Sequence, residues 1–546
     1  MSGIKTLNKN GRYLRISLYC ILILAGILRY LNISSGLDLK DYEMSLTWAK
    51  IDEETTLNCL FGTLFRGDLN PHNFIYPSLY RYFLFLIFYL FFLPKAILTR
   101  SGVLALLQVQ AMQNPSMFFL ISRYVSAAFG VATIYILYRL VKKISNSRIA
   151  FISSLFLALS PLHIRESHFG TIDATLTFMM LLSLFFILKI YLKSRLKDYL
   201  LSGLLIGLAI SIKYNAFVLV LPLLVAHFLQ RKAGLGLLGY GFLAILFSFL
   251  IGTPFSILAP FEFFGDIKIQ ISSLFPEGIL ANIGFLFRYK LLSWLFIGIL
   301  IGIFLAFNKK NYPWVILYVY YFSYYVLTLA NKGFFGRYLL PFVSIFYALG
   351  TWILYSGLER IFRRNTFIVI LILALLAIVP FLQSIYHWHR ALSFQDSRQE
   401  FLRWVSDNNF TDKKVFYLTS SQLASRAKKD SQLGVCFWDV ISSSDKKLAS
   451  LNKKLFLQRI IINLKNIITS KDSNYEYYVV SAEVALEQSS YRNLLAVLLR
   501  HCDLIYELNF ESIRRNDKEL FLFLPFDAYS RNQKAGPHIA VFKKCL

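Results

Sequence analysis

The chain has 546 residues, of which 56% are hydrophobic, more than a soluble protein of this size would carry. Its 58 Lys and Arg against 31 Asp and Glu give a formal charge of +27. On a soluble protein this charge would favour nucleic acid as a partner. Here most cations stand in short clusters between apolar runs, as the positive-inside rule predicts. The composition therefore indicates a multi-pass α-helical membrane protein that contacts membrane lipids and binds no nucleic acid.

Apolar runs long enough to cross about 30 Å of hydrocarbon recur from Leu14 to about Leu382. No small-x-small cleavage site follows the first run, at roughly 13–33, so we expect a retained span. Cationic clusters separate the runs, and taking each cluster as cytoplasmic fixes the topology. The clusters are Lys5/Lys9/Arg12, Lys142/Lys143/Arg148, Lys189/Lys193/Arg195/Lys197, Arg231/Lys232, Lys309/Lys310 and Arg360/Arg363/Arg364.

A parity argument decides the role of the apolar stretch 76–94. The first span runs outward from a cytoplasmic N-terminus, so an odd number of further crossings must precede the cluster at Lys142. Two apolar stretches lie there, 76–94 and 117–138, and only one of them can span. The stretch 76–94 starts with Tyr-Pro and carries Arg81. We therefore expect it to form an interfacial or re-entrant helix within a first outer loop at 34–116.

The stretch 200–229 lies between two cationic clusters and must cross twice or not at all. At about 1.5 Å per residue it can form only a shallow hairpin, with its tip near Lys213. Together with the other spans this gives about eleven transmembrane helices. The other spans are 13–33, 117–138, 149–166, 172–190, 235–252, 283–306, 312–330, 339–356 and 366–384.

The chain is expected to divide into a transmembrane domain at 1–386 and a soluble, extracytoplasmic domain at 387–546. In the second domain, Phe401–Val405 and Leu494–Leu499 have a helical pattern, whereas Lys414–Leu418 and Tyr475–Val480 resemble strands. These elements predict an α/β domain, and no motif in it indicates catalysis.

With this topology, four polar segments all fall on the outer face of the membrane. Ionisable groups near a bilayer are costly, so such a gathering indicates function, although a single charged residue at a span end is more often a solvated boundary residue. The segments are Asp52-Glu53-Glu54 followed by Gly67–His72 and Tyr76–Tyr80, Ser160–His168 followed by Asp173, Lys213-Tyr214-Asn215, and Lys332 followed by Gly336–Pro341.

Sugar transfer from a polyprenyl phosphate would use both signs of charge in this set. The phosphate is a good leaving group, and cations such as Lys213 and Arg337 would offset the charge that develops on it. The acceptor hydroxyl needs a base, which contributes about 10²–10⁴ in rate. A partly desolvated carboxylate such as Asp52 fits that role, because burial raises its basicity.

Several blocks share their order and spacing with a known clan. Asp52-Glu53, Gly67-Asp68-Leu69-Asn70-Pro71-His72 and Tyr76-Pro77-Ser78-Leu79 come first, and Arg123–Gly130, Leu159–His168 with Thr171–Thr177, Leu204–Asn215 and Gly252–Phe255 follow. At these blocks the sequence resembles the GT-C glycosyltransferases that use lipid-phosphate sugars, the clan of protein O-mannosyltransferases and aminoarabinose transferases. The bacterial dolichyl-phosphate-mannose-protein mannosyltransferase-like members are the most similar. The resemblance covers about 10–385. One departure is Lys50-Ile51, which stands where those proteins have His-Pro.

The resemblance implies a GT-C fold in a bacterial inner membrane, a polyprenyl-phosphate sugar donor, and a protein, lipid or glycan acceptor. It implies Asp52 as the base, Asp173 as a second acidic residue and Glu53 as a support of the loop. Lys213, Arg337 and Lys332 would contact the donor phosphate. The pocket would be lined by His72, Tyr76, His163, Arg165, His168 and Tyr214. For His163 and His168, a structural role at a helix end is an equal expectation.

Two other functions compete with glycosyl transfer. A transporter or lipid-linked sugar flippase should show charges near mid-span and an internal repeat, whereas the acidic residues here stand at span ends. A non-catalytic envelope assembly protein would keep only the scaffold. The sequence shows no certain cofactor and no metal-ligand cluster, and it leaves open the sugar, the acceptor, the anomeric outcome, the metal dependence and the oligomeric state.

Overall fold

The structure is a computed structural model, and it describes residues 2–37, 51–231, 233–272, 302–303, 311–329, 336–362, 365–393, 397–408, 415–418, 477–481, 498–499, 502–508 and 539–544. Contacts divide the chain into two compact units, with the main division between Ile385 and Tyr386. Each unit is described by itself.

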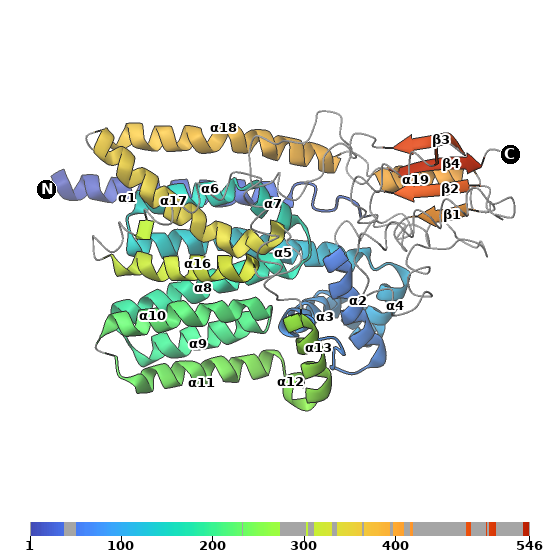
Figure 1. Ribbon diagram of the computed structural model, residues 1–546, viewed down its shortest axis with the longest axis horizontal. Helices are drawn as coiled ribbons and strands as arrows, with labels where there is room; N and C mark the ends of the chain where they lie inside the picture. Colours follow the sequence, from blue (N-terminus) through green and yellow to red (C-terminus); the bar gives the residue numbers. More distant parts are fainter. Residues whose placement is uncertain are drawn as a thin grey trace. The chain divides into compact units, whose positions relative to one another are not determined.

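The larger unit is built from helices (Figure 1). From residue 2 to residue 230 these are α1 (Ser2–Tyr30), α2 (Ile51–Arg66), α3 (Leu79–Thr99), α4 (Val103–Gln113), α5 (Ser116–Ile144), α6 (Ser147–Ala158), α7 (Pro161–His168), α8 (Ile172–Lys193), α9 (Leu196–Ile210), the 3₁₀ helix η3 (Tyr214–Leu219) and α10 (Val220–Gln230). There follow α11 (Leu235–Gly252), α12 (Phe255–Leu258), α13 (Pro260–Ser272), α16 (Tyr312–Leu329), the 3₁₀ helix η4 (Gly336–Leu339), α17 (Leu340–Ile361) and α18 (Thr366–Ser393), which runs across the division.

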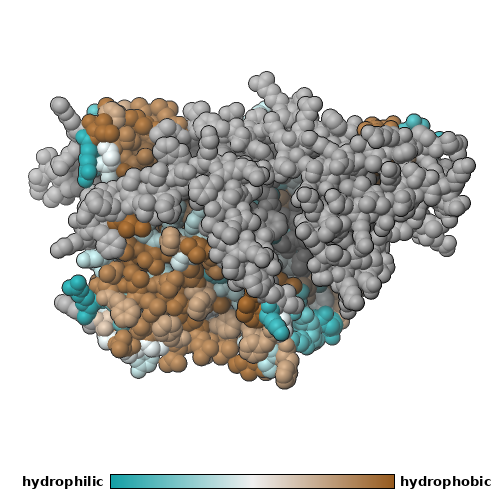
Figure 2. Space-filling model, viewed as in Figure 1, coloured by the Kyte–Doolittle hydropathy of each residue, from teal (hydrophilic) through white to brown (hydrophobic). Residues whose placement is uncertain are grey.

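Among the described residues, five helices are long and apolar enough to cross a membrane, and α6 with α7 make a sixth if that bent pair is one span. Large apolar side chains remain exposed along them; on α11, for example, Leu243 and Phe247 are more than half exposed. Figure 2 shows apolar residues covering the visible sides of the helices and hydrophilic residues at their ends. The chain is therefore an integral membrane protein. The total of eleven spans stays a prediction, and nearly all of 283–306 lies outside the described residues.

Helix α3 passes the same test of length and composition, so that test does not separate an interfacial helix from a span. It packs on the first half of α5 through three ring pairs, Phe83 with Phe129 and both Phe88 and Phe92 with Phe118. The interfacial placement of 76–94 stays a prediction.

A bend interrupts the stretch that the sequence suggested as one straight span at 149–166. Helix α6 ends at Ala158, α7 begins at Pro161, and the two meet at 56°. Arg29 of α1, fully buried, donates from Nη1 to the Ala158 carbonyl (3.1 Å) and from Nη2 to the Leu157 carbonyl (3.3 Å). Pro161 has no N–H to donate to the Leu157 carbonyl, and the guanidinium supplies a further donor to both carbonyls at the break. An interaction across 128 residues thus stabilises a bend that local patterns do not reveal.

The expected hairpin at 200–229 takes the form of α9, a turn at 211–213, η3 and α10. The Tyr199 hydroxyl at the start of α9 lies 2.7 Å from Nδ1 of His227 near the end of α10, so the two arms run side by side in opposite directions. Lys213 lies at the tip, as the sequence predicted.

Helices α9 and α11 approach closely because small residues face each other. A Cβ at Gly203 would collide with the carbonyl oxygen of Gly241, and one at Gly207 with the carbonyl oxygen of Ile245 and the hydroxyl of Ser248. Gly203 and Gly207 stand four residues apart, the spacing that lets membrane helices touch through their backbones. This packing fixes the arm that ends at Lys213.

The smaller unit contains a four-stranded sheet in the order β1-β2-β4-β3 (Figure 1). Strands β1 (Val415–Leu418) and β2 (Tyr477–Ser481) are parallel, and β4 (Ile539–Lys544) is antiparallel to both β2 and β3 (Cys502–Leu508). Helix α19 (Ser397–Asp407) contributes Trp404, whose ring stacks 4.5 Å from Tyr506. Burial and the Glu400 carboxylate raise the pKa of Tyr506 to about 12. The strands β1 and β2 coincide with the two segments that resembled strands.

Replacement of Gly207 by Val should separate α9 from α11, because the added carbons meet backbone atoms that cannot move aside. The expected cost is about 1–3 kcal/mol of folding free energy, read as a lower aggregation temperature of the detergent-solubilised protein. Gly239→Val in α11 is the control, since no atom lies within 4 Å of a Cβ there. Equal aggregation temperatures for the two variants would contradict this packing.

Candidate functional site

Asp173 and Lys213 form a buried ion pair. The Lys213 Nζ donates to Asp173 Oδ1 at 2.9 Å, and the two side chains are 11% and 4% exposed. Asp173 is the second residue of α8, where the free N–H groups and dipole of a helix favour a carboxylate. Lys213 directly precedes η3 at the hairpin tip. Burying two charges is expensive unless they are paired, so this contact holds the hairpin tip onto the start of α8.

Aromatic rings surround the ammonium group of this pair. Lys213 Nζ lies 4.7 Å from the ring centre of Tyr338 and 5.7 Å from that of Tyr76. Arg337 is half-buried in η4, and its guanidinium carbon lies 5.4 Å from the centre of the same Tyr338 ring. Cations placed over aromatic faces are attracted by the ring quadrupole. Of the expected site residues, the structure thus brings Asp173, Lys213, Tyr76 and Arg337 into one neighbourhood.

A pocket opens beside this pair. Its wall includes Ile172, directly before Asp173, and Tyr76, whose ring neighbours Lys213. The ion pair is therefore next to the pocket, although neither Asp173 nor Lys213 is among the residues that line it. The complete lining is Thr56, Cys59, Asn73, Ile75, Tyr76, Pro77, Tyr80, Arg81 and Ile172, which come from α2, the following loop, α3 and the start of α8.

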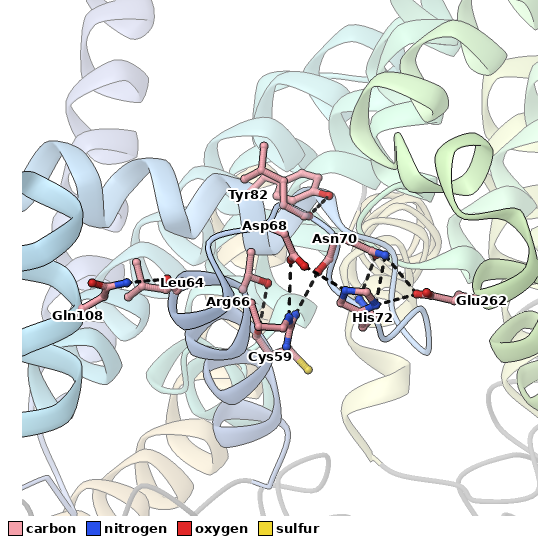
Figure 3. Close-up of polar contacts among 11 residues, drawn as sticks. Cys59, Leu64, Arg66, Asp68, Asn70, His72, Tyr82, Gln108 and Glu262 are labelled. Carbon is pink, nitrogen blue, oxygen red and sulfur yellow. Dashed lines mark hydrogen bonds and ion pairs between the residues drawn. The ribbon is translucent and has the colours of Figure 1, made fainter.

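The loop that forms part of this wall is anchored to α13 (Figure 3). His72 has a left-handed backbone (φ 48°), and its Nδ1 lies 2.9 Å from Glu262 Oε2 while its Nε2 lies 3.2 Å from Asp68 Oδ2. The Asn70 amide donates to the same Glu262 oxygen at 3.2 Å. His72 is 41% exposed and works as a link between two carboxylates.

Two further bonds connect this loop to the neighbouring segments. The Phe74 N–H donates to Asp266 of α13 at 2.6 Å, and the Tyr214 hydroxyl donates to the Phe74 carbonyl at 2.8 Å. Tyr214, expected in the pocket, therefore supports the loop from the side of the hairpin tip.

Glu53 is fully buried and holds α2 against α5 and the turn before α8. Arg123 donates to it from Nε at 2.8 Å and from Nη2 at 2.9 Å, a bidentate arrangement, and the Gly170 N–H donates to Oε1 at 2.8 Å. A Cβ at Gly170 would approach Ser122 to 2.6 Å, so the turn needs a glycine. These contacts engage both oxygens of Glu53, and its role as a support of the loop stays a prediction.

The two histidines of α7 form hydrogen bonds with the end of α1 and the turn that follows it, and with the α7 backbone. Nδ1 of His163 accepts a hydrogen bond from Arg29 Nη2 at 2.9 Å, and the His163 side chain is fully buried. His168 places Nδ1 2.8 Å from the Ile164 carbonyl and Nε2 3.0 Å from the Leu31 carbonyl. Arg165 forms an ion pair with Glu166 at 3.7 Å. These contacts favour the structural interpretation of both histidines, and none of them involves a residue lining the pocket.

The side chains of two expected site residues lie outside the described part of the chain. Asp52 is the second residue of α2, but its side chain lies outside the described part of the chain, as does the whole of Lys332. Sequence reasoning did not assign a site role to Tyr338 or Arg81. The signal for Arg81 was the presence of a cation within an apolar stretch that starts with Tyr76-Pro77. Among the described residues, no group of three or more His, Cys, Asp and Glu is placed to hold a metal ion.

Comparison with solved structures gives distant similarities. The oligosaccharyltransferase of Archaeoglobus fulgidus, solved in a complex with Zn and sulfate, shares 13% sequence identity with this chain at a TM-score of 0.48. The match covers 90% of this chain and 71% of the oligosaccharyltransferase chain. With ArnT from Cupriavidus metallidurans in the apo state, identity is 13% and the TM-score is 0.46 over 91% of this chain and 96% of that one. None of the curated proteins compared with the chain matches it.

A family match covers the stretch from α5 to α12. Residues 119–258 match the model described as dolichyl-phosphate-mannose-protein mannosyltransferase. The matched stretch contains Arg123, Asp173 and Lys213, whereas Asp52, His72 and Arg337 lie outside it. Within residues 119–258 the resemblance recognised in the sequence is thereby confirmed, and this stretch of the chain is similar to the dolichyl-phosphate-mannose-protein mannosyltransferases.

Proposed function

We propose that this chain is a glycosyltransferase that moves a sugar from a polyprenyl-phosphate donor to a hydroxyl acceptor on the outer face of the membrane. The observation that carries the proposal is the buried Asp173–Lys213 pair at the border of a pocket, inside the stretch that matches the mannosyltransferase family. The family description names a dolichyl-phosphate sugar, which supports a lipid-phosphate donor for this chain.

The position of the site along α8 supports an outer location. Asp173 stands at the beginning of α8 and Lys193 at its end, 20 residues later. At about 1.5 Å per residue this separation is about 30 Å, the thickness of the hydrocarbon core. Because Lys193 belongs to a cationic cluster, which the positive-inside rule assigns to the cytoplasm, the site belongs on the opposite face. The proposed setting is a bacterial inner membrane with a cytoplasmic N-terminus.

In the proposed reaction, the acceptor hydroxyl attacks the anomeric carbon while the bond from that carbon to the phosphate oxygen breaks. The proton passes to the carboxylate of Asp52, and the phosphate leaves on the lipid. Position 52 precedes Thr56 by one turn of α2 and Cys59 by two, and both of these line the pocket. Asp173, held by Lys213, orients the acceptor side of the site, and Arg337 adds positive charge beside the departing phosphate.

Removal of the base should abolish transfer. For Asp52→Asn we expect transfer to fall by about 10²–10⁴, because an amide cannot take the hydroxyl proton. The measurement is transfer from polyprenyl-phosphate sugars by the purified chain in detergent, with Asp407→Asn, an exposed residue of α19, as the control. Undiminished transfer by the Asp52 variant would remove the assigned base. Efficient transfer from a nucleotide sugar would overturn the lipid donor.

A paired substitution separates the structural from the catalytic contribution of the ion pair. Lys213→Met leaves the buried Asp173 carboxylate unpaired and should cost about 3–5 kcal/mol of stability. In the double variant Asp173→Leu with Lys213→Met, no charge is left unpaired, so stability should largely return while transfer stays lost. Aggregation temperature and transfer rate report the two effects. A double variant that transfers sugar as well as the natural chain would confine this pair to a structural role.

A further inference from the structure

Arg81 is a buried cation in a helix that is otherwise mostly apolar. It lies in the first turn of α3 and is 7% exposed. Its Nη2 donates to the Tyr76 carbonyl at 2.6 Å, which fixes the guanidinium beneath the loop that enters the helix. One hydrogen bond to a carbonyl does not neutralise the charge.

The other terminal nitrogen of Arg81 is buried and has no hydrogen-bond partner among the described residues. The side chain also lines the pocket, together with Tyr76, Tyr80 and Thr56. Burying a charged donor without a partner is costly, so such a group is usually completed by a ligand or an opposite charge. The Arg81 side chain is therefore placed to bind an anion that enters this pocket.

Two other buried cations near the site, Lys213 and Arg123, are each paired with a carboxylate. Lys213 lies 2.9 Å from the Asp173 carboxylate, and Arg123 forms two bonds to Glu53. An anion that bound to either of these would have to compete with a buried carboxylate. Arg81 forms no ion pair with a described residue, because its bonded partner is a neutral carbonyl. Among the described residues of the pocket wall it is the cation best placed to attract a phosphate.

The surface next to the pocket indicates what the anion is attached to. Ile75, which lines the pocket, is 39% exposed, and farther along α3 large apolar side chains, including Leu86, Leu90 and Leu98, are exposed at 52–84% of their area. A free anion would gain nothing from such a surface, whereas the acyl or prenyl chain of a lipid would contact it favourably. The combination of a buried guanidinium and an apolar helix face fits a phosphate that carries a hydrocarbon chain.

We propose that Arg81 binds the phosphate of the polyprenyl-phosphate donor, with Nη1 donating to a phosphate oxygen while Nη2 keeps the Tyr76 carbonyl. The inference rests on the proposed function and assigns its donor phosphate to a residue of α3. Lys213 then keeps its bond to Asp173 while the donor is bound.

Binding of lipids to the full-length chain in detergent tests this assignment without the need for an acceptor. The ligands are a polyprenyl phosphate and the matching polyprenol, which has no charge. We expect Arg81→Gln to weaken binding of the phosphate by roughly 10- to 100-fold, the effect of one charge-assisted hydrogen bond, and to leave polyprenol binding unchanged. Arg81→Lys should restore part of the loss. The control is Lys95→Gln, an exposed cation of the same helix, which should bind both lipids as the natural chain does.

The outcomes separate this inference from the proposed function. If the natural chain binds no polyprenyl phosphate, the lipid donor itself is wrong. If the natural chain binds it and Arg81→Gln binds it equally well, only the role of Arg81 is overturned. Equal losses of phosphate and polyprenol binding would show that Arg81 merely supports the Tyr76 loop. Competition by inorganic phosphate at the affinity of the lipid would instead assign the pocket to a free anion.

Discussion

The buried contact between Asp173 and Lys213 is the interaction on which the candidate site depends. It joins the start of α8 to the tip of the α9–α10 hairpin, two segments 40 residues apart, at 2.9 Å. Neither charge could remain in the low-dielectric surroundings without the other. The Lys213 ammonium then brings the rings of Tyr76 and Tyr338 together, and so draws the first loop and the segment before α17 to the same place.

Two other buried charges of the larger unit are also held by polar partners. Glu53 is bonded to Arg123 and the Gly170 N–H, and Arg29 donates to carbonyls at the α6–α7 break. Each of these contacts fixes a backbone segment that borders the site. Nε of Arg29 and Nη1 of Arg81 are buried without a partner among the described residues, and of these two arginines only Arg81 lines the pocket. A buried cation that lines a pocket and keeps one donor without a partner indicates the place where a ligand completes the structure.

The sequence predicted those parts of the site that depend on local pattern. The hairpin tip at Lys213 followed from the length of an apolar stretch between two cationic clusters, and the position of Asp173 followed from the start of the next span. Contacts between distant segments could not be predicted in this way. The role of His163 depends on Arg29, 134 residues earlier, and that of His72 depends on Glu262 of α13, 190 residues later. Arg81 was noticed only as a polar residue in an apolar stretch, because its burial depends on the loop above it.

The central claim is that the site faces the outside of the membrane while the cationic clusters face the cytoplasm. Labelling of single cysteines in intact cells with a membrane-impermeant maleimide tests it directly, in a chain whose native cysteines are replaced by serine. Position 262 is half-exposed beside the first loop, and Arg231 is exposed at the end of α10. The account predicts that Glu262→Cys is labelled from outside and that Arg231→Cys is labelled only after the cells are opened. Labelling of Arg231→Cys from outside, with Glu262→Cys protected, would contradict it.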